Sequence, residues 1–188
     1  VRGDQLRIAR EFQHRVVKRL LLLDGEITPT VPSPYPLGPE AFHDLVTAWK
    51  KRVLEEPLTL RDVVVSQSLK GPPESYERGQ KGDGSPMPVP VHVAVARVLQ
   101  ERGADVSEGA RVEYVVVDGD ATPIRAVPAA DYWPGMEDRA YLWESKVWPP
   151  TRRLLAAAFP DHNWSRFDEG KDRGGGRGKS AYLPGQVH

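Results

Sequence analysis

Three stretches decide the fold: LTLRDVVVSQSLKGPPESY at 58–76, VPVHVAVARVLQERGADVSEGARVEYVVVDG at 89–119 and DRAYLWESKVWPPTRRLLAAAF at 138–159. The first joins a β-branched run to a Gly-Pro-Pro loop, and the second joins a helical repeat to a strand pattern. The third repeats apolar residues at helical spacing on both sides of two prolines. We therefore expect an α+β fold that is mainly helical and carries a small β-hairpin.

Two further helices precede this region. The spacing of apolar residues predicts one over 5–23 and another over 40–54, which starts at Pro39 or Glu40. The proline-rich stretch 25–39 between them predicts a loop. The first helix has an apolar face and a basic face. The basic face is either an ordinary solvated surface or one that in part contacts phosphate groups. The apolar face carries Ile8, Phe12, Val16, Leu20 and Leu23, and the basic face carries Arg7, Arg10, His14 and Lys18.

The middle of the chain is less uniform. Residues 60–69 fit a short helix followed by an extended piece, because the run of valines favours extension. Residues 71–90 are rich in Gly, Pro and Ser and predict a long loop, which is usually either functional or disordered. Residues 91–102 predict a helix that ends at Gly103. We expect its core face to carry Val91, Val95, Val98 and Leu99.

The last third predicts a hairpin, two helices and a tail. Alternating residues from Val112 lead to a turn at Asp118-Gly119, and 122–127 forms the returning strand. Asp138 is placed to cap a helix that runs to about Val147, and the following Pro149-Pro150 is expected to break it. A last helix then ends at Phe159-Pro160. Tyr141, Trp143, Trp148 and Phe159 are expected to be core or docking aromatics.

Composition excludes several classes of site. The 188 residues include 26 basic and 26 acidic side chains, so no overall field indicates nucleic acid, although local segregation of charge can still build a basic face. The absence of cysteine excludes disulfides, thiol nucleophiles and cysteine-ligated zinc, and it suits a reducing cytoplasm. The apolar runs, such as LLLL at 20–23 and LLAAAF at 154–159, are too short to span a membrane.

Candidate phosphate contacts cluster around the Gly-Pro-Pro loop. Lys70 follows an extended segment, where a lysine can reach a phosphate, and Ser66 and Ser68 can add hydroxyl donors. His92 begins a helix, and helix N-termini offer free N–H groups to anions. Each residue also has an ordinary explanation, as a surface lysine, a local polar contact or a packed histidine. Tyr76, Arg78 and Lys81 add an aromatic ring and two cations to the same loop.

No enzymatic motif is recognisable. Asp118 and Asp120 flank a glycine, but a hairpin turn uses Asp-Gly for its backbone geometry. Asp161-His162 is equally isolated, and the histidines other than His92 look scattered along the chain. The GGGRG run at 174–178 follows no strand, so it is no phosphate loop. We predict no catalytic residue and no metal ligand in this chain.

Five segments in order resemble the end of a family B DNA polymerase, namely the last palm helix and the thumb that grips the primer–template duplex. They are VRGDQLRIAREFQHRVV at 1–17, LRDVVVSQSLKGPPESY at 60–76, VPVHVAVARVLQERG at 89–103, GARVEYVVVDG at 109–119 and DRAYLWESKVWPPTRRLL at 138–155. The resemblance covers about residues 1–160. It implies a long palm helix followed by a helical thumb with a small hairpin.

The resemblance also implies a domain division and a set of contacts. We expect a palm segment and linker at 1–57, a thumb at 58–164 and a flexible Gly/Arg-rich tail at 165–188. The resemblance assigns duplex binding to three positions, and charge alone adds three more. The first set is Lys70, Tyr76 and His92, and the second is Arg78, Lys81 and Arg97.

The partners implied are double-stranded primer–template DNA and the remaining palm, fingers and exonuclease, with no membrane. The catalytic aspartates and the Mg²⁺ of the complete polymerase belong outside this chain, which holds no cofactor. The expected location is the cytoplasm, at the nucleoid. Three departures stand out: Gln67 occupies a position where relatives often carry lysine, loop 71–90 is long, and the tail lacks the clamp-binding pattern of relatives.

Two other interpretations stay open. In the first interpretation, the chain is a stand-alone DNA-binding module or a split-polymerase subunit without activity of its own. Its first helix would then bind a separate palm through Phe12, Val16 and Leu20. Alternatively, it is a globular domain of unrelated function, for example hydrolytic, that resembles the family by accident.

Overall fold

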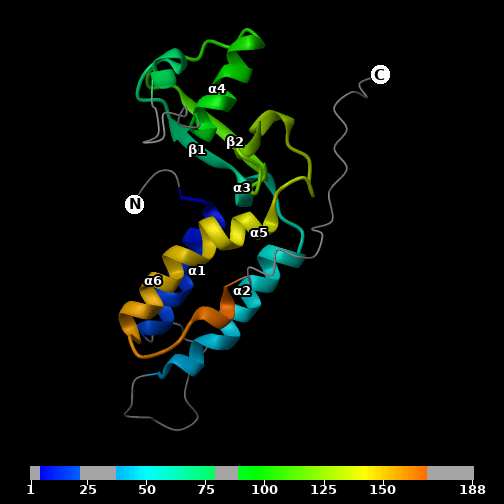
Figure 1. The fold of residues 1–188 in the computed structure, drawn as a ribbon. Helices are drawn as coiled ribbons and strands as arrows, with labels where there is room; N and C mark the ends of the chain where they lie inside the picture. The colour runs from blue at the N-terminus through cyan, green and yellow to red at the C-terminus, as the bar shows by residue number, and fades with distance from the viewer. Residues whose placement is uncertain (1–4, 22–36, 79–88, 169–188) are drawn as a thin grey trace.

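The computed structural model describes residues 5–21, 37–78 and 89–168, and the ribbon divides into a helical part and a sheet part (Figure 1). Within these ranges the fold class is α+β and mainly helical with a hairpin, as expected. The elements are α1 (Arg7–Leu20), the 3₁₀ helix η1 (Pro39–Phe42), α2 (His43–Glu55), α3 (Leu60–Val63), β1 (Val65–Ser68), the 3₁₀ helix η2 (Pro73–Arg78), α4 (Val91–Glu101), β2 (Arg111–Asp118), β3 (Arg125–Pro128), the 3₁₀ helix η3 (Ala129–Asp131), α5 (Arg139–Tyr141), the π-helical η4 (Leu142–Val147), α6 (Trp148–Ala158) and the 3₁₀ helix η5 (Ser165–Phe167).

The predicted apolar face of α1 is confirmed as the centre of the helical part. Ile8, Phe12 and Val16 are all 0% exposed. The Phe12 ring stacks on the rings of Trp49 and Trp143, with centroids 5.1 and 6.1 Å apart. These contacts join α1 to α2 and to η4, so burial of aromatic surface holds the helical part together. Leu20 is only half-buried, and Leu23 lies outside the described residues.

The sheet has the order β1-β2-β3 and is antiparallel throughout. Residues 60–69 form a short helix followed by a strand, as the valine run indicated, and a capping box between Thr59 and Asp62 begins the helix. Helix α4 packs against β2 and β3, so it covers one face of the sheet. Of its predicted core face, Val95 is buried, Val91 and Leu99 are half-buried and pack against the core, and Val98 is half-buried. Val93 and Ala96 are buried as well, and the prediction did not include them.

Two predictions about connections are wrong. The hairpin does not turn at Asp118-Gly119 alone, since β3 begins only at Arg125 and a bulge interrupts the pairing between Val116 and Asp118. The region 71–90 is not all loop, because η2 occupies Pro73–Arg78. Distant residues contribute to both segments: the Asp138 side chain accepts from the Gly119 N–H, and Arg97 donates to the Pro73 carbonyl.

The prolines at 149–150 do not break the terminal helix. Asp138 caps α5 as predicted, accepting a hydrogen bond from the Tyr141 amide at 2.9 Å. The chain then winds as a π-helix over η4 and continues directly into α6, whose first turn holds both prolines.

The packing crosses two predicted boundaries. The terminal helices η4 and α6 pack on α1, so residues on both sides of position 57 share one core. Ordered structure also continues past Trp164: Phe167 is 4% exposed, and its carbonyl accepts a hydrogen bond from the Trp143 indole at 2.9 Å. The expectation of a tail from 165 is therefore wrong for 165–168. Residues 169–188 lie outside the described part, and the three-domain division stays a prediction.

Candidate nucleic-acid interface

Lys70 emerges at a corner where β1 ends. The preceding residue, Leu69, is 2% exposed and fixes this corner through its backbone. Its N–H donates to the Ala110 carbonyl, and its carbonyl accepts from the Gly109 N–H, each at 3.0 Å. These bonds extend the pairing of β1 and β2 by one step. The Lys70 side chain is consequently exposed at the end of a rigid strand.

Tyr76 connects this corner to α4. Its hydroxyl accepts a hydrogen bond from the Lys70 backbone N–H at 2.8 Å. Its ring meets the His92 ring edge to face, with centroids 6.1 Å apart at 87°. The structure therefore brings together Lys70, Tyr76 and His92, which come from three segments of the chain. We call these three residues the corner cluster.

Arg97 holds the loop of the corner cluster in place. Its guanidinium donates to the Pro73 carbonyl at 3.2 Å, and Pro73 begins η2. Gln100, one turn further along α4, adds a bond to the Glu74 side chain at 3.4 Å. This arrangement gives Arg97 a positioning role, while its predicted contact with DNA stays a prediction.

The other charged candidates of the loop stay predictions. Arg78 is the last residue of η2, and Lys81 lies outside the described residues.

Burial favours the uncharged imidazole form of His92, because it lowers the pKa of this side chain below the ordinary value of 6.5. A neutral imidazole both donates and accepts hydrogen bonds, so His92 would meet a phosphate or sugar as a hydrogen-bonding group and not as a cation. It lies in the first turn of α4, where no side chain caps the helix and the backbone N–H groups favour anions.

Arg111 is a cation beside the corner that sequence reasoning missed. It begins β2 directly opposite Ser68, and its guanidinium donates to the Ser66 hydroxyl. Gln67 points to the other face of β1, where its side-chain oxygen accepts from the Tyr114 hydroxyl at 2.9 Å. Only the register of β1 and β2 places Arg111 near Lys70. The alternation of apolar and polar residues around Val112 is the sequence signal that bears on this register.

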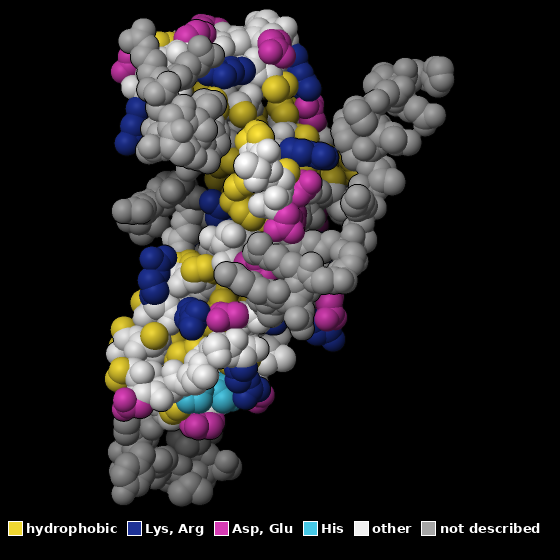
Figure 2. Space-filling view, viewed as in Figure 1, with side chains coloured by type: hydrophobic (Ala, Val, Ile, Leu, Met, Phe, Trp, Pro, Cys, Tyr) yellow, Lys and Arg dark blue, Asp and Glu magenta, His cyan; other side chains and the backbone are white. Residues whose placement is uncertain are grey.

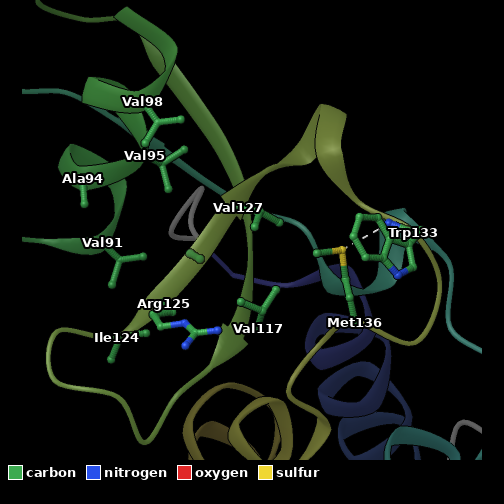
Figure 3. Close-up of a pocket in the computed structure, with 11 residues that line it drawn as sticks. Val91, Ala94, Val95, Val98, Val117, Ile124, Arg125, Val127, Trp133 and Met136 are labelled. Atoms are coloured by element: carbon green, nitrogen blue, oxygen red, sulfur yellow. Dashed lines mark hydrogen bonds between the residues drawn. The ribbon is translucent and has the colours of Figure 1, made fainter. Parts of the chain in front are cut away.

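A groove lies between α4 and the strands β2 and β3, and none of the corner cluster lines it. Figure 3 shows its lining residues. Its volume is about 390 Å³, and valines of α4 face β3 across it. Trp133, 49% exposed, and Met136 close one end, while Arg125 is its charged member. The groove is therefore a mainly apolar surface, distinct from the corner cluster.

Charge is mixed on the face shown in Figure 2, where basic and acidic side chains alternate over both parts of the molecule. Among the described residues, no group of three or more His, Asp or Glu comes close enough to hold a metal ion. None of the described helices has the length and apolar character to cross a membrane. This geometry supports local contacts with a polar ligand.

Comparison with known proteins gives related results by sequence and by structure. DNA polymerase 2 of Aeropyrum pernix is 26% identical over 179 residues, which is 94% of this chain and 18% of the relative. The family B DNA polymerase of Pyrobaculum calidifontis superposes with a TM-score of 0.57 and 25% identity, over 80% of this chain and 18% of that one. The chain is related to the family B DNA polymerases. It spans about a fifth of the length of these two polymerases. No protein-family model matches it.

Proposed function

We propose that this chain is the C-terminal palm and thumb portion of a family B DNA-directed DNA polymerase. In this proposal it holds the primer–template duplex through contacts with the sugar–phosphate backbone that do not depend on base sequence. The observation that carries the proposal is the corner cluster, in which Tyr76 contacts both Lys70 and His92. The relation to family B polymerases supports the choice of ligand.

Each member of the corner cluster has a distinct part in this proposal. Lys70 supplies an exposed positive charge for a phosphate oxygen. The Tyr76 oxygen accepts from a backbone amide, so its own hydrogen can be donated to the ligand. His92 adds a neutral hydrogen-bonding group. Contacts of this kind position a duplex without reading its sequence.

The chemistry of synthesis would belong to other parts of the polymerase. Phosphoryl transfer requires carboxylates that hold two metal ions. The described residues bring together no such group, so they do not fit the Mg²⁺ of the complete enzyme and we derive no step through it. This chain would support synthesis by keeping the primer end in register.

Fluorescence anisotropy with a labelled primer–template duplex tests the proposal. Neutralising about three phosphates predicts that a fourfold rise in salt weakens binding roughly 40-fold. We expect micromolar or weaker affinity for the 188-residue chain, equal for unrelated sequences, and a further loss in Lys70→Ala. Lys51→Ala, an exposed lysine on α2, is the matched control and should bind normally. Affinity that is the same at both salt concentrations would contradict the proposal.

A second test uses the assembled polymerase. Lys70→Ala should lower processivity more than single-nucleotide insertion, because a weaker grip acts on every translocation and the chemical step is untouched. Equal loss of both activities would remove Lys70 from this role.

The alternative of a stand-alone module or split subunit loses one of its supports. In that interpretation, Phe12, Val16 and Leu20 form an interface for a separate palm. Phe12 and Val16 are 0% exposed within the core of this chain, so they are not available to a partner.

A further inference from the structure

A cleft with a polar lining lies in the helical part, between α1 and α2. Its volume is about 380 Å³, and it is open to solvent. Three arginines line it: Arg15 and Arg19 from α1, and Arg52 from α2. Ala48 and Trp49 form part of its wall, and Glu56 is the acidic residue in the lining. We call this site the arginine cleft. The corner cluster lies in the sheet part of the molecule (Figure 1).

Fixed contacts hold two of these guanidinium groups in place. The Arg52 guanidinium lies over the Trp49 indole, 4.6 Å from the ring centroid. Arg19 donates to the Ala41 carbonyl at 3.2 Å. Arg15 is exposed one helical turn before Arg19, which separates their backbones by about 6 Å along the helix. Arginines held in this way lose little conformational freedom when they bind a ligand.

The charge of the cleft suits an anion. Three guanidinium groups face the single carboxylate of Glu56 in the lining. Arg52 also lies 3.5 Å from Glu11, but both side chains are about a third exposed, so this ion pair is weak and a ligand can compete with it. The forked donors of arginine match the oxygens of phosphate well.

We propose that the arginine cleft binds phosphate groups of a nucleic-acid strand, at a site separate from the corner cluster. Phosphate is the shared chemistry, which a phosphodiester strand or a free pyrophosphate can supply. The choice of a nucleic-acid strand over an acidic peptide rests on the proposed function. Binding at both sites would give one chain two separate holds on nucleic acid.

The test uses the full 188-residue chain labelled with ¹⁵N. Pyrophosphate and a single-stranded oligonucleotide are titrated separately, and the indole N–H signal of Trp49 reports binding in the cleft. Ala48→Glu adds a carboxylate to the cleft wall and should weaken both ligands by at least tenfold. Thr47→Glu is the matched control, since it adds the same charge at the neighbouring exposed position. Both substitutions are at exposed sites, so folding is retained.

The outcomes separate this inference from the proposed function. A shift of the Trp49 signal that Ala48→Glu abolishes and Thr47→Glu preserves supports the cleft. No shift, or equal weakening by both variants, overturns it. A polyglutamate peptide that binds at least as tightly as the oligonucleotide overturns the choice of nucleic acid. The Trp49 signal reports on the cleft alone, so failure of the duplex grip would be seen separately in the duplex assay.

Discussion

Replacing Gly119 by alanine should destabilise the fold, although the backbone at this position is ordinary. A Cβ atom at Gly119 would lie 2.1 Å from Cδ2, 2.5 Å from Cγ and 2.7 Å from Cβ of Tyr141. Rotation of the ring cannot relieve the last of these contacts, because Cβ is attached to the main chain. The backbone itself is held, since the Gly119 N–H donates to the Asp138 side chain at 2.9 Å.

The expected loss follows from two opposing effects. Inserting a methyl group into a packed site costs about 1–3 kcal/mol, and the fixed Tyr141 Cβ places this case near the upper end. Alanine also restricts the unfolded chain, which returns roughly 0.4–1 kcal/mol of stability. The net loss in free energy of unfolding is then about 2 kcal/mol, which for a chain of this size lowers Tm by roughly 4–8 °C.

Thermal and urea unfolding followed by circular dichroism would measure this loss. Gly38→Ala is the matched control: its added Cβ meets only a carboxylate oxygen of Glu40, at the end of an exposed and flexible side chain, so stability should change little. In a Tyr141→Gly background the penalty of Gly119→Ala should disappear, since the Cβ atom of residue 141 is removed together with the ring. A penalty that persists in that background, or a loss below about 0.5 kcal/mol in the native one, would refute the steric explanation.

Three further predictions follow from named contacts. The Nε2 atoms of His43 and His162 are 2.9 Å apart, and desolvation, then Arg166 and His162, lower the pKa of His43 below 6.5. The His43 imidazole therefore accepts a second proton less readily in the folded chain than in the unfolded chain, so Tm should fall as the pH drops below about 6.5. The fall in Tm should be smaller in His162→Gln than in the native chain. Tyr76→Phe should leave Tm nearly unchanged but weaken duplex binding about fivefold by anisotropy, because Lys70 loses its 2.8 Å anchor. Phe167→Ala, at a 4% exposed site, should cost about 3 kcal/mol in urea unfolding, and unchanged stability would place Phe167 outside the core.

Elements whose signal is local were predictable from the sequence. The apolar repeat of α1 identified Ile8, Phe12 and Val16 as core because a helix brings such residues to one face. Asp138 was recognised as a cap from its position before a helical run. Local rules failed where distant residues decide the backbone. Gly119 was interpreted as a turn residue, whereas the Tyr141 ring is what requires a glycine there.

The candidate site shows the same limit. Residue type together with the family resemblance singled out Lys70, Tyr76 and His92, but no periodicity reveals that Tyr76 contacts both of the others. Arg111 was missed because only strand register places it beside the corner. The interpretation of the histidines as scattered is wrong for His43 and His162, which lie 119 positions apart and share a hydrogen bond.

The segment 137–139 fixes how the corner cluster and the arginine cleft are oriented. The Asp138 N–H donates to the Val116 carbonyl of the sheet at 3.0 Å, while its side chain caps the terminal helix. Arg139 bonds to the buried Glu137 carboxylate at 2.8 Å and to the Glu56 carbonyl at the end of α2.

Tyr132 stabilises the same segment, 137–139, through its contact with Glu137. Desolvation and the Glu137 carboxylate raise its pKa to about 12, so its hydroxyl keeps the proton that it donates to Glu137. A buried ion pair with further hydrogen bonds of this kind favours one geometry over others. If the corner cluster and the arginine cleft both bind nucleic acid, segment 137–139 sets the angle between the two contacts. A substitution at Glu137 would then change how the two sites are placed relative to each other more than it would change the structure of either site.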